Sequence, residues 1–456
     1  MWAKAANSSA QVKIATVLLT LIPLYYFSYR LISRSNKSHP TTKASKILNR
    51  TKWQQQWLET DLLQPWDPLP IQMKCNETKW ISNLVFDLVN ANGGVGNIRA
   101  EILDFLFYAI ESGASIILPS MAIRRDDDLS KVVGAEEADF SYMFDELWFL
   151  EAMRKACPQM RIYESAEELG DGWKKEEQTY DPRVPWSRKD LSQGQWKQQT
   201  ADWLAGRKIT ADVSAVVAIE HTMWETNCRG ERPAFRRALG MVLHVRPDVR
   251  RYAAIAMFNM AATERLDLLP TDRIHRKAFY GAHLRTEADT IAAGWLWPPS
   301  DAEIGLDFTL QTSYYMQAAV THGLSIIFAA SGNASEVERF KQVAAANRPP
   351  LTVLSKWDLL SEAEGDALQA MHWDQQALVD LEILKRCSVF GGVAKSSFSF
   401  LIAVARTTYM EEEDEAIQDP WSARHRDKMV AFENKLNKIW GRNQLNEERI
   451  PKGAWP

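Results

Sequence analysis

The fold is decided by the stretch ISNLVFDLVNANGGVGNIRAEILDFLFYAIESGASIILP, residues 81–119. Its first part, 81–90, is an apolar run that predicts a buried strand, and the glycine-rich turn after it predicts a change of direction. Apolar residues then recur at helical spacing from Ile98 to Ile110, and Gly113 follows where a helix would end. The run ASIILP predicts another strand, and this order of strand, helix and strand indicates a parallel sheet.

The same alternation returns in the second half of the chain, starting at AFYGAHLR. Apolar runs separated by helical patterns predict a second parallel sheet there. The expected strands are 278–285, 324–331, 351–355 and 388–392, and the expected helices are 314–323, 335–346 and 375–387. Residues 233–257, between the two regions, are expected to form two more helices. We therefore predict an α/β protein with two Rossmann-like domains that face a cleft.

The composition is that of a folded globular protein, with 456 residues, 46% of them hydrophobic and 25% charged. The 54 basic and 58 acidic residues give a net charge of −4, so the chain lacks the basic field that attracts nucleic acid. Its 18 tryptophans suit hydrophobic cores and sugar-binding clefts alike. Nucleic acid is therefore not an expected partner.

An apolar segment near the N-terminus predicts a membrane anchor. Residues 14–29 carry no charge, and a helix extended to Ile32 is about 28 Å long, close to the ~30 Å hydrocarbon core of a bilayer. We expect a short tail at 1–13, a transmembrane signal anchor at 14–32 and a polar, proline-spaced stem at 33–78. A cleaved signal peptide is the alternative, but no small-x-small cleavage site follows the apolar run.

The sequence contains conflicting signals for the compartment of the main body. More basic residues follow the apolar segment than precede it, which by the positive-inside rule opposes a luminal body. N-x-S/T glycosylation motifs and four cysteines favour the lumen, although four cysteines allow three pairings and also occur in reduced proteins. The motifs that follow the apolar segment start at Asn36, Asn49, Asn76 and Asn333, and the cysteines are Cys75, Cys157, Cys228 and Cys387.

Two polar segments at predicted strand ends could bind a ligand. NGGVGNIRAE, residues 92–101, has glycines that would let backbone N–H groups approach a phosphate or a sugar; the alternative is a tight turn. HLRTEAD, residues 283–289, ends a strand in Arg285, whose guanidinium can hold a diphosphate with two parallel hydrogen bonds. The alternative for Arg285 is a structural ion pair with Glu287 or Asp289.

A third segment, GGVAKSSFSF at 391–400, follows the last predicted strand. Its hydroxyl and N–H groups could bind an anion, or Ser396 and Ser397 could simply cap the next helix. Asp126–Asp128 resemble carboxylates that hold a divalent metal, but we favour a solvated loop. The eight histidines show no paired metal-ligand spacing, so zinc is not expected.

Together these segments resemble the GDP-fucose protein O-fucosyltransferase superfamily. The family's glycine turn is similar to GGVGNIRAEI, its strand ending in LP to IILP, and its F-D-x-x-x-F-I pattern to FDELWFL at 144–150. Its HLRxExD signature matches residues 283–289 position for position. Its VDLxIL, xFxGN and SSF segments are similar to VDLEIL from Val379, VFGG from Val389 and SSFSF from Ser396. The resemblance covers roughly residues 80–410.

The resemblance implies a GT-B-like fold, a GDP-sugar donor in the cleft, inversion at the anomeric carbon and no required metal or other cofactor. Asn97 would contact donor or acceptor, and Arg285 would hold the β-phosphate and support departure of GDP. Asp380 would help to recognise guanine. The other implied donor or substrate contacts are Gly93, Gly94, Gly96, Arg99, His283, Ser396, Ser397 and Phe398.

The chain departs from the family pattern at two places. Some members have a glutamate in the glycine turn as general base, whereas this chain has Val95 there. Glu101 and Asp104, on the following helix, are candidate bases by location alone. The family's asparagine in FxGN is Gly392 here.

We expect an acceptor-side domain at 79–245, a donor-side domain at 246–410, and an acidic run with a packing helix at 411–456. The expected function is an inverting, metal-independent transfer of fucose from GDP-fucose to a hydroxyl of a protein or glycan. The expected location is the Golgi or endoplasmic reticulum membrane, as a single-pass type II protein with a luminal body. The alternatives are a non-catalytic, membrane-tethered nucleotide- or glycan-binding pseudoenzyme, and a GT-B enzyme that uses another nucleotide sugar.

Overall fold

The first predicted strand, helix and strand form the centre of a parallel sheet. They are β1 (Leu84–Leu88), α4 (Val95–Ser112) and β2 (Ser115–Ile117). Gly113 ends α4 in the left-handed conformation, with φ of 70°, as its position predicts. The sheet has the order β5-β2-β1-β7-β6, in which β5 is Ile162–Tyr163, β6 is Lys174–Lys175 and β7 is Ala215–Ile219.

The second half of the chain forms a six-stranded sheet with the order β10-β9-β8-β11-β13-β12. Its first five strands in this order are parallel, and β12 pairs antiparallel with β13. The strands are β8 (Tyr280–His283), β9 (Ile326–Ala330), β10 (Thr352–Leu354), β11 (Val389–Val393), β12 (Val430–Glu433) and β13 (Asn437–Trp440). The connecting helices include α10 (Phe308–Thr321), α11 (Ala334–Ala346), α14 (Trp373–Leu384) and α15 (Ser397–Glu413). Each of the two alternating regions of the sequence thus forms its own sheet, which confirms a mixed α/β fold.

This computed structural model describes residues 49–88, 91–125, 136–170, 172–175, 180, 193–209, 214–219, 228–287, 307–394, 396–413, 429–441 and 453–456. Helices α7 (Pro233–Gly240) and α8 (Pro247–Thr263) are the two expected between the alternating regions. The other helices are α2 (Arg50–Leu58), α3 (Leu69–Glu77), α5 (Glu146–Ala156), α6 (Gln193–Gly206), α12 (Lys356–Leu359) and α13 (Glu362–Gln369). Short elements are β3 (Met121–Ala122), β4 (Glu137–Ala138) and the 3-10 turns Phe140–Tyr142, Ala166–Leu169 and Cys228–Gly230.

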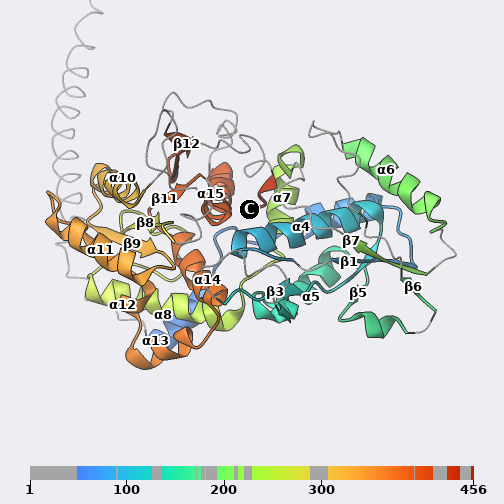
Figure 1. Ribbon diagram of the computed structural model, residues 1–456, viewed down its shortest axis with the longest axis horizontal. Coiled ribbons are helices and arrows are strands. Elements are labelled where there is room, and N and C mark those ends of the chain that lie inside the picture. Colours follow the sequence, from blue (N-terminus) through green and yellow to red (C-terminus); the bar gives the residue numbers. More distant parts are fainter. Residues whose placement is uncertain are drawn as a thin grey trace, which may run out of the picture. The chain divides into compact units, whose positions relative to one another are not determined.

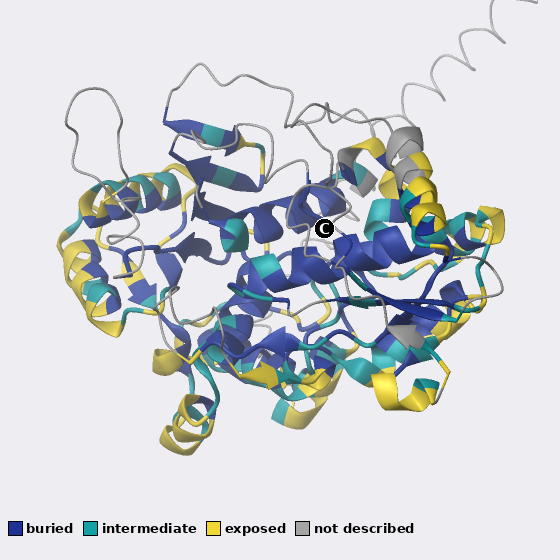
Figure 2. Cartoon of the chain, turned by 45° about the vertical axis from the view of Figure 1, so that its right-hand side comes forward, coloured by how far each residue is buried: buried dark blue, intermediate teal, exposed yellow. Residues whose placement is uncertain are grey.

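Within Arg50–Pro456, helices α4, α14 and α15 pack against one another between the two sheets (Figure 1). The central strands β1, β2, β7, β8, β9 and β11 are almost entirely buried, while the outer helices carry exposed stripes (Figure 2). In each sheet the strand order reverses direction beside its first strand, between β1 and β7 and between β8 and β11. Ligands of open α/β sheets bind outside the carboxyl ends of strands at such reversals. The three polar segments of the sequence lie at the carboxyl ends of β1, β8 and β11, and therefore at these points.

The prediction of a stem from 33 to 78 is wrong for residues 50–78. Trp57, in α2, is fully buried, and the Arg386 guanidinium lies 3.8 Å from the centre of its ring. Helix α3 is joined to the end of α5 by a disulfide between Cys75 and Cys157. These residues belong to the body because the tryptophan rings bury apolar area that an extended stem would leave in water.

The packing helix predicted within 411–456 is wrong for residues 429–441, because they contain the β12–β13 hairpin. Burial alternates along β12, where Val430 and Phe432 are buried, and this two-residue period suits a strand. The Asn434 side-chain oxygen accepts the N–H groups of Leu436 and Asn437 and so stabilises the turn.

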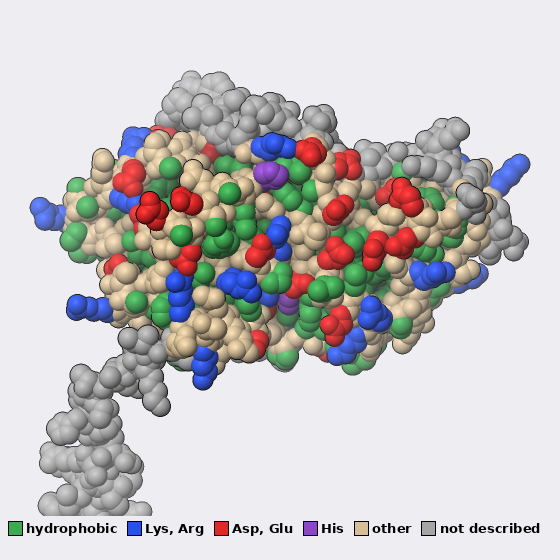
Figure 3. Space-filling model, turned by 90° about the horizontal axis from the view of Figure 1, so that it is seen from below, with side chains coloured by type: hydrophobic (Ala, Val, Ile, Leu, Met, Phe, Trp, Pro, Cys, Tyr) green, Lys and Arg blue, Asp and Glu red, His purple; other side chains and the backbone are tan. Residues whose placement is uncertain are grey.

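The predicted anchor at 14–32 and the part of the predicted stem before residue 49 lie outside the described residues, as do Asn36, Asp126–Asp128 and Asp289. None of the helices in the described ranges is long and apolar enough to cross a bilayer. The face of the molecule in Figure 3 carries Lys and Arg side chains interspersed with Asp and Glu, in line with the small net charge.

Candidate functional site

A cavity of about 880 Å³ lies where the polar segments meet. Nine of the eleven predicted site residues line it: Gly94, Gly96, Asn97, His283, Arg285, Asp380, Ser396, Ser397 and Phe398. Its wall therefore combines the glycine turn after β1 with the ends of β8 and β11, which are distant in the sequence. This size is typical of a site that encloses a small ligand.

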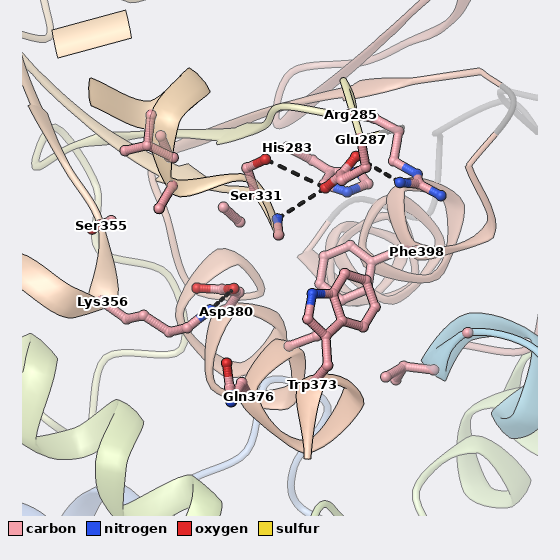
Figure 4. Close-up of a pocket in the computed structure, with 18 of the residues that line it drawn as sticks. His283, Arg285, Glu287, Ser331, Ser355, Lys356, Trp373, Gln376, Asp380 and Phe398 are labelled. Carbon is pink, nitrogen blue, oxygen red and sulfur yellow. Dashed lines mark hydrogen bonds and ion pairs between the residues drawn. The ribbon is translucent and has the colours of Figure 1, made fainter. Parts of the chain in front are cut away.

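Arg285 lies on the cavity wall, just after β8, and is 9% exposed. Its Nη1 is 2.6 Å from Glu287 Oε2, and the other oxygen of Glu287 accepts the N–H of Gly332 at 2.9 Å (Figure 4). The side chain of Gln311 holds the backbone of Arg285 through two hydrogen bonds of 2.9 Å. Burial raises the pKa of Glu287, but Arg285 and its other partners more than offset this and keep it low. Arg285 thus forms the ion pair with Glu287 that the sequence offers as its alternative role, and this pair orients the guanidinium on the cavity wall.

His283 supplies a neutral imidazole to the same wall. Burial lowers its pKa to about 4, so the ring is uncharged at neutral pH. Its Nδ1 lies 2.8 Å from Ser399 Oγ, which accepts the N–H of Val393. A Cβ at Gly392 would lie 2.5 Å from that Oγ. Glycine in place of the family's asparagine therefore leaves room for the hydroxyl that contacts His283.

Two helices begin at the cavity. Helix α4 starts after Gly94, and α15 starts at Ser397, whose Oγ donates to Asn97 Oδ1 at 2.6 Å. The two helix ends approach so closely that a Cβ at Gly96 would lie 2.8 Å from the Ser397 carbonyl carbon. Helix N-termini present unpaired N–H groups and a partial positive charge, so together they favour an anion.

At another part of the cavity, Asp380 Oδ2 lies 2.5 Å from the ammonium of Lys356 (Figure 4). Burial raises the pKa of Asp380, while Lys356 opposes this rise. The second carboxylate oxygen, Oδ1, is buried and has no hydrogen-bond partner among the residues that the structure describes. A buried acceptor on a cavity wall is suited to a ligand N–H group.

The structure adds cavity residues that sequence reasoning missed, such as Lys356, Trp373, Gln376 and Arg124. Trp373 and Gln376 precede Asp380 by seven and four positions on α14, so helical spacing alone places them on the same face. The Arg124 guanidinium lies 4.3 Å from the centre of a Trp373 ring. No local signal in the sequence marks Arg124, since it follows the two-residue strand β3.

Two predicted site residues do not line the cavity. Gly93 adopts φ of 100°, and a Cβ there would meet the Asn97 side chain, so its role is to shape the turn. Arg99 donates to the carbonyl oxygens of Trp455, at 3.1 Å, and Gly240, at 2.6 Å. Because Arg99 lies 200° around the helix from Asn97, it faces away from the cavity. Arg99 is therefore not placed to contact a ligand in this cavity, contrary to what the resemblance implies.

The two candidate general bases on α4, Glu101 and Asp104, also lie away from the cavity. Glu101 Oε2 accepts the N–H of Asn92 at 2.9 Å, and burial raises the pKa of Glu101 to about 8. Asp104 Oδ1 accepts the indole N–H of Trp455 at 2.7 Å. Neither carboxylate lines the cavity, so neither can reach a substrate hydroxyl there.

A family profile described as GDP-fucose protein O-fucosyltransferase matches residues 86–409. The chain belongs to this family. It is a glycosyltransferase of the fucosyltransferase type, and GDP-fucose is the donor that the family name specifies. The match begins in β1 and ends in α15, so it includes every cavity residue discussed above.

Solved structures similar to this O-fucosyltransferase family member are remote in sequence. POFUT1 in complex with GDP is 12% identical, with 72% of this chain and 96% of that chain covered and a TM-score of 0.42. POFUT1 in complex with GDP-fucose is 13% identical, with coverages of 80% and 99% and a TM-score of 0.41. A variant of FUT1 from Arabidopsis thaliana in complex with GDP is 12% identical, with coverages of 74% and 71% and a TM-score of 0.36. No curated protein sequence matches significantly.

Proposed function

We propose that the chain transfers fucose from GDP-fucose to a hydroxyl of a protein or glycan acceptor, with inversion and without a metal ion. The observation that carries the proposal is the position of Arg285 on one cavity with the N-termini of α4 and α15. A diphosphate develops negative charge when its bond to the sugar breaks. A guanidinium and two helix N-termini are positive groups that stabilise such a leaving group.

The individual side chains have distinct roles in this proposal. Arg285 holds the β-phosphate, with its direction set by Glu287. His283, neutral at physiological pH, contributes a hydrogen bond rather than a charge. Ser396, Ser397 and Phe398 bind around the phosphates, and Asn97, bonded to Ser397, contacts donor or acceptor. Asp380 Oδ1 accepts N–H groups of guanine, whose edge offers adjacent donors.

Inversion requires an acceptor hydroxyl to attack opposite the leaving GDP in one step. In this proposal the bond to GDP breaks ahead of attack, the acceptor oxygen bonds to the anomeric carbon, and its proton passes to a phosphate oxygen of the departing GDP. The described cavity residues at the start of α4 and after β3 include no carboxylate that could take this proton. Those residues are Gly94, Val95, Gly96, Asn97, Arg124 and Arg125. The anomeric configuration of the product, measured by NMR, tests inversion.

We also propose that the protein is anchored in the Golgi or endoplasmic reticulum membrane as a single-pass type II protein with a luminal body. The disulfide between Cys75 and Cys157 supports an oxidising compartment. The exposed motif at Asn76 supports the same compartment. Protection from added protease in intact microsomes, lost on addition of detergent, tests the topology.

The main experiment incubates the purified 456-residue chain with GDP-fucose in the presence of EDTA and measures GDP release and GDP binding. Release that is lost in Arg285→Ala supports the proposed donor chemistry. Binding without release, with and without candidate acceptors, supports the pseudoenzyme alternative. Tighter binding of UDP or ADP than of GDP would point to a different nucleotide sugar. Release that depends on added Mg²⁺ or Mn²⁺ would reject metal independence.

A further inference from the structure

The first turn of α14 is bonded to residues that belong to the first half of the chain. Tyr142 Oη donates to Asp374 Oδ1 at 2.5 Å, and His372 Nδ1 lies 2.9 Å from the same Oη. Asp374 Oδ2 accepts the backbone N–H of Arg124 at 3.1 Å. The Gln375 side chain donates to the carbonyl oxygen of Tyr142 at 2.9 Å. We call these five residues the interlobe latch.

The carboxylate at the centre of the interlobe latch, that of Asp374, is shielded from solvent. Asp374 is fully buried, and both of its oxygens are used, one by each of two separate segments of the first half. Hydrogen bonds to a buried carboxylate are stronger than those between neutral groups. Oδ1 also accepts the N–H of Gln375 at 2.8 Å, so loss of the Tyr142 hydroxyl removes one of its two donors. The contact is therefore specific in direction and costly to break.

The same helix carries residues of the donor cavity on another face. Trp373, Gln376, Ala377 and Asp380 line the cavity, and their spacing of three, four and seven positions places them on one side of α14. Asp374 and Gln375 lie 100° and 200° around the helix from Trp373, toward the latch contacts. One short helix thus joins the two halves of the chain with one face and shapes the donor cavity with another.

The latch also orders the opposite wall of the cavity. By accepting the Arg124 N–H, Asp374 holds the residue whose guanidinium stacks over Trp373. On the other side of the Trp373 ring, the backbone at Gly332, after β9, can lie close to the indole only because glycine has no Cβ, which would clash with the ring. Trp373 is thus held between the segment after β3 and the end of β9.

We propose that Tyr142 and Asp374 are positioning residues that fix α14, and with it Trp373 and Asp380, for binding of the nucleotide donor. This inference rests on the proposed function, since it assigns a task at the same cavity. Neither residue needs to touch the donor. Their effect should therefore appear in donor affinity and KM rather than in kcat.

The test compares Tyr142→Phe with Tyr180→Phe in the full chain. Each change removes one hydroxyl from a tyrosine with a short hydrogen bond, because Tyr180 Oη lies 2.6 Å from Thr200 Oγ1 at a place away from the cavity. Tyr142→Phe should weaken GDP binding and raise the KM for GDP-fucose about tenfold, with kcat within about twofold of native. Tyr180→Phe should leave both constants within about twofold. In a double-mutant cycle, Asp374→Asn should add little once Tyr142 is phenylalanine.

Hydrogen exchange without ligand gives a second readout. The amide of Arg124 should exchange faster in Tyr142→Phe than in native protein or Tyr180→Phe. Equal exchange, or a GDP affinity of Tyr142→Phe within twofold of native, would overturn the latch. If native protein binds no GDP, the proposed function fails, and the exchange comparison still decides whether the two halves are joined as inferred.

Discussion

Arg285 and Arg99 both belong to sequence motifs of the family and both are 9% exposed, but they occupy different environments. Arg285, after β8, faces a carboxylate oxygen of Glu287 and lies on the cavity wall. Arg99, in the first turns of α4, is surrounded by the carbonyl oxygens of Gly240, Trp455 and Pro456. Burial lowers the pKa of Arg99 to about 10, so it too remains charged at neutral pH.

This comparison shows that burial and charge alone do not identify a binding arginine. A guanidinium whose donors point to backbone carbonyls joins segments of the fold, in this case α4, the end of α7 and residues 455–456. A guanidinium oriented by one carboxylate beside a cavity can bind an anion there. Substitutions should therefore separate the two arginines by activity and by stability.

The largest effect is expected for Arg285→Ala. GDP release from GDP-fucose should fall by about 10²–10³-fold, the usual cost of removing a group that stabilises a developing negative charge. The melting temperature should also fall, because the buried Glu287 carboxylate loses the charge that pairs with it, so rates are compared at a temperature where both proteins are folded. Initial rates and thermal unfolding measure the two effects, and Arg285→Lys serves as a control that keeps charge without the planar fork. Full activity of Arg285→Ala would refute the assigned role.

Arg99→Met should lower stability without lowering GDP affinity. It leaves buried carbonyl oxygens without their donors, and the free energy of unfolding should fall by about 3 kcal/mol. The Kd for GDP should stay within about twofold of native, because Arg99 does not line the cavity. Urea unfolding and GDP titration provide the two measurements. A large loss of GDP affinity with unchanged stability would mean that the two arginines do not differ as the structure indicates.

Gly96→Ala tests the contact between the two helix N-termini. The new methyl group would lie 2.8 Å from the Ser397 carbonyl carbon, so α4 and α15 must separate. The KM for GDP-fucose should rise about tenfold, because the anion site depends on both helix ends. Gly206→Ala is the matched control, since no atom lies within 4 Å of its added Cβ. Equal KM values in the two variants would show that this close approach is not needed for donor binding.

The smallest effect is expected for Glu287→Gln. The amide keeps an oxygen for the Gly332 N–H but loses the charge that orients Arg285, so turnover should fall about fivefold. The folded-state pKa of Glu287 is lowered, so its contribution to stability is present above its unfolded pKa and lost as the pH falls through the folded value. Unfolding measured from pH 7 down to pH 3 should therefore show a shallower acid loss in the variant. An unchanged acid profile would argue against a stabilising ion pair.

Much of the fold followed from local pattern. The helix ending at Gly113 and the strands at β8, β9, β10 and β11 appear where apolar periodicity predicted them, because each pattern reflects which faces are buried. The HLR and SSF segments could be assigned to one site by resemblance. The resemblance could not assign Arg99, although its angular distance of 200° from Asn97 on α4 was a usable signal.

Other features had no adequate local signal. Residues 50–58 look polar, yet α2 buries Trp53 and Trp57. The latch joins Tyr142 to Asp374, which are 232 positions apart. Patterns within a short stretch of sequence cannot predict a contact between residues so far apart.

The sequence by itself determined the two alternating α/β regions, the strand ends that carry the glycine turn and HLR, and membership of the O-fucosyltransferase family. These depend on short-range periodicity and on residue types that remain readable in a linear chain. Only the tertiary structure decided that Asn97 meets Ser397, that Arg99 turns away from the cavity and that α14 is bonded to Tyr142. Such contacts arise because packing brings distant segments within hydrogen-bond range, and their partners are selected by the burial of whole helices and sheets rather than by neighbouring residues.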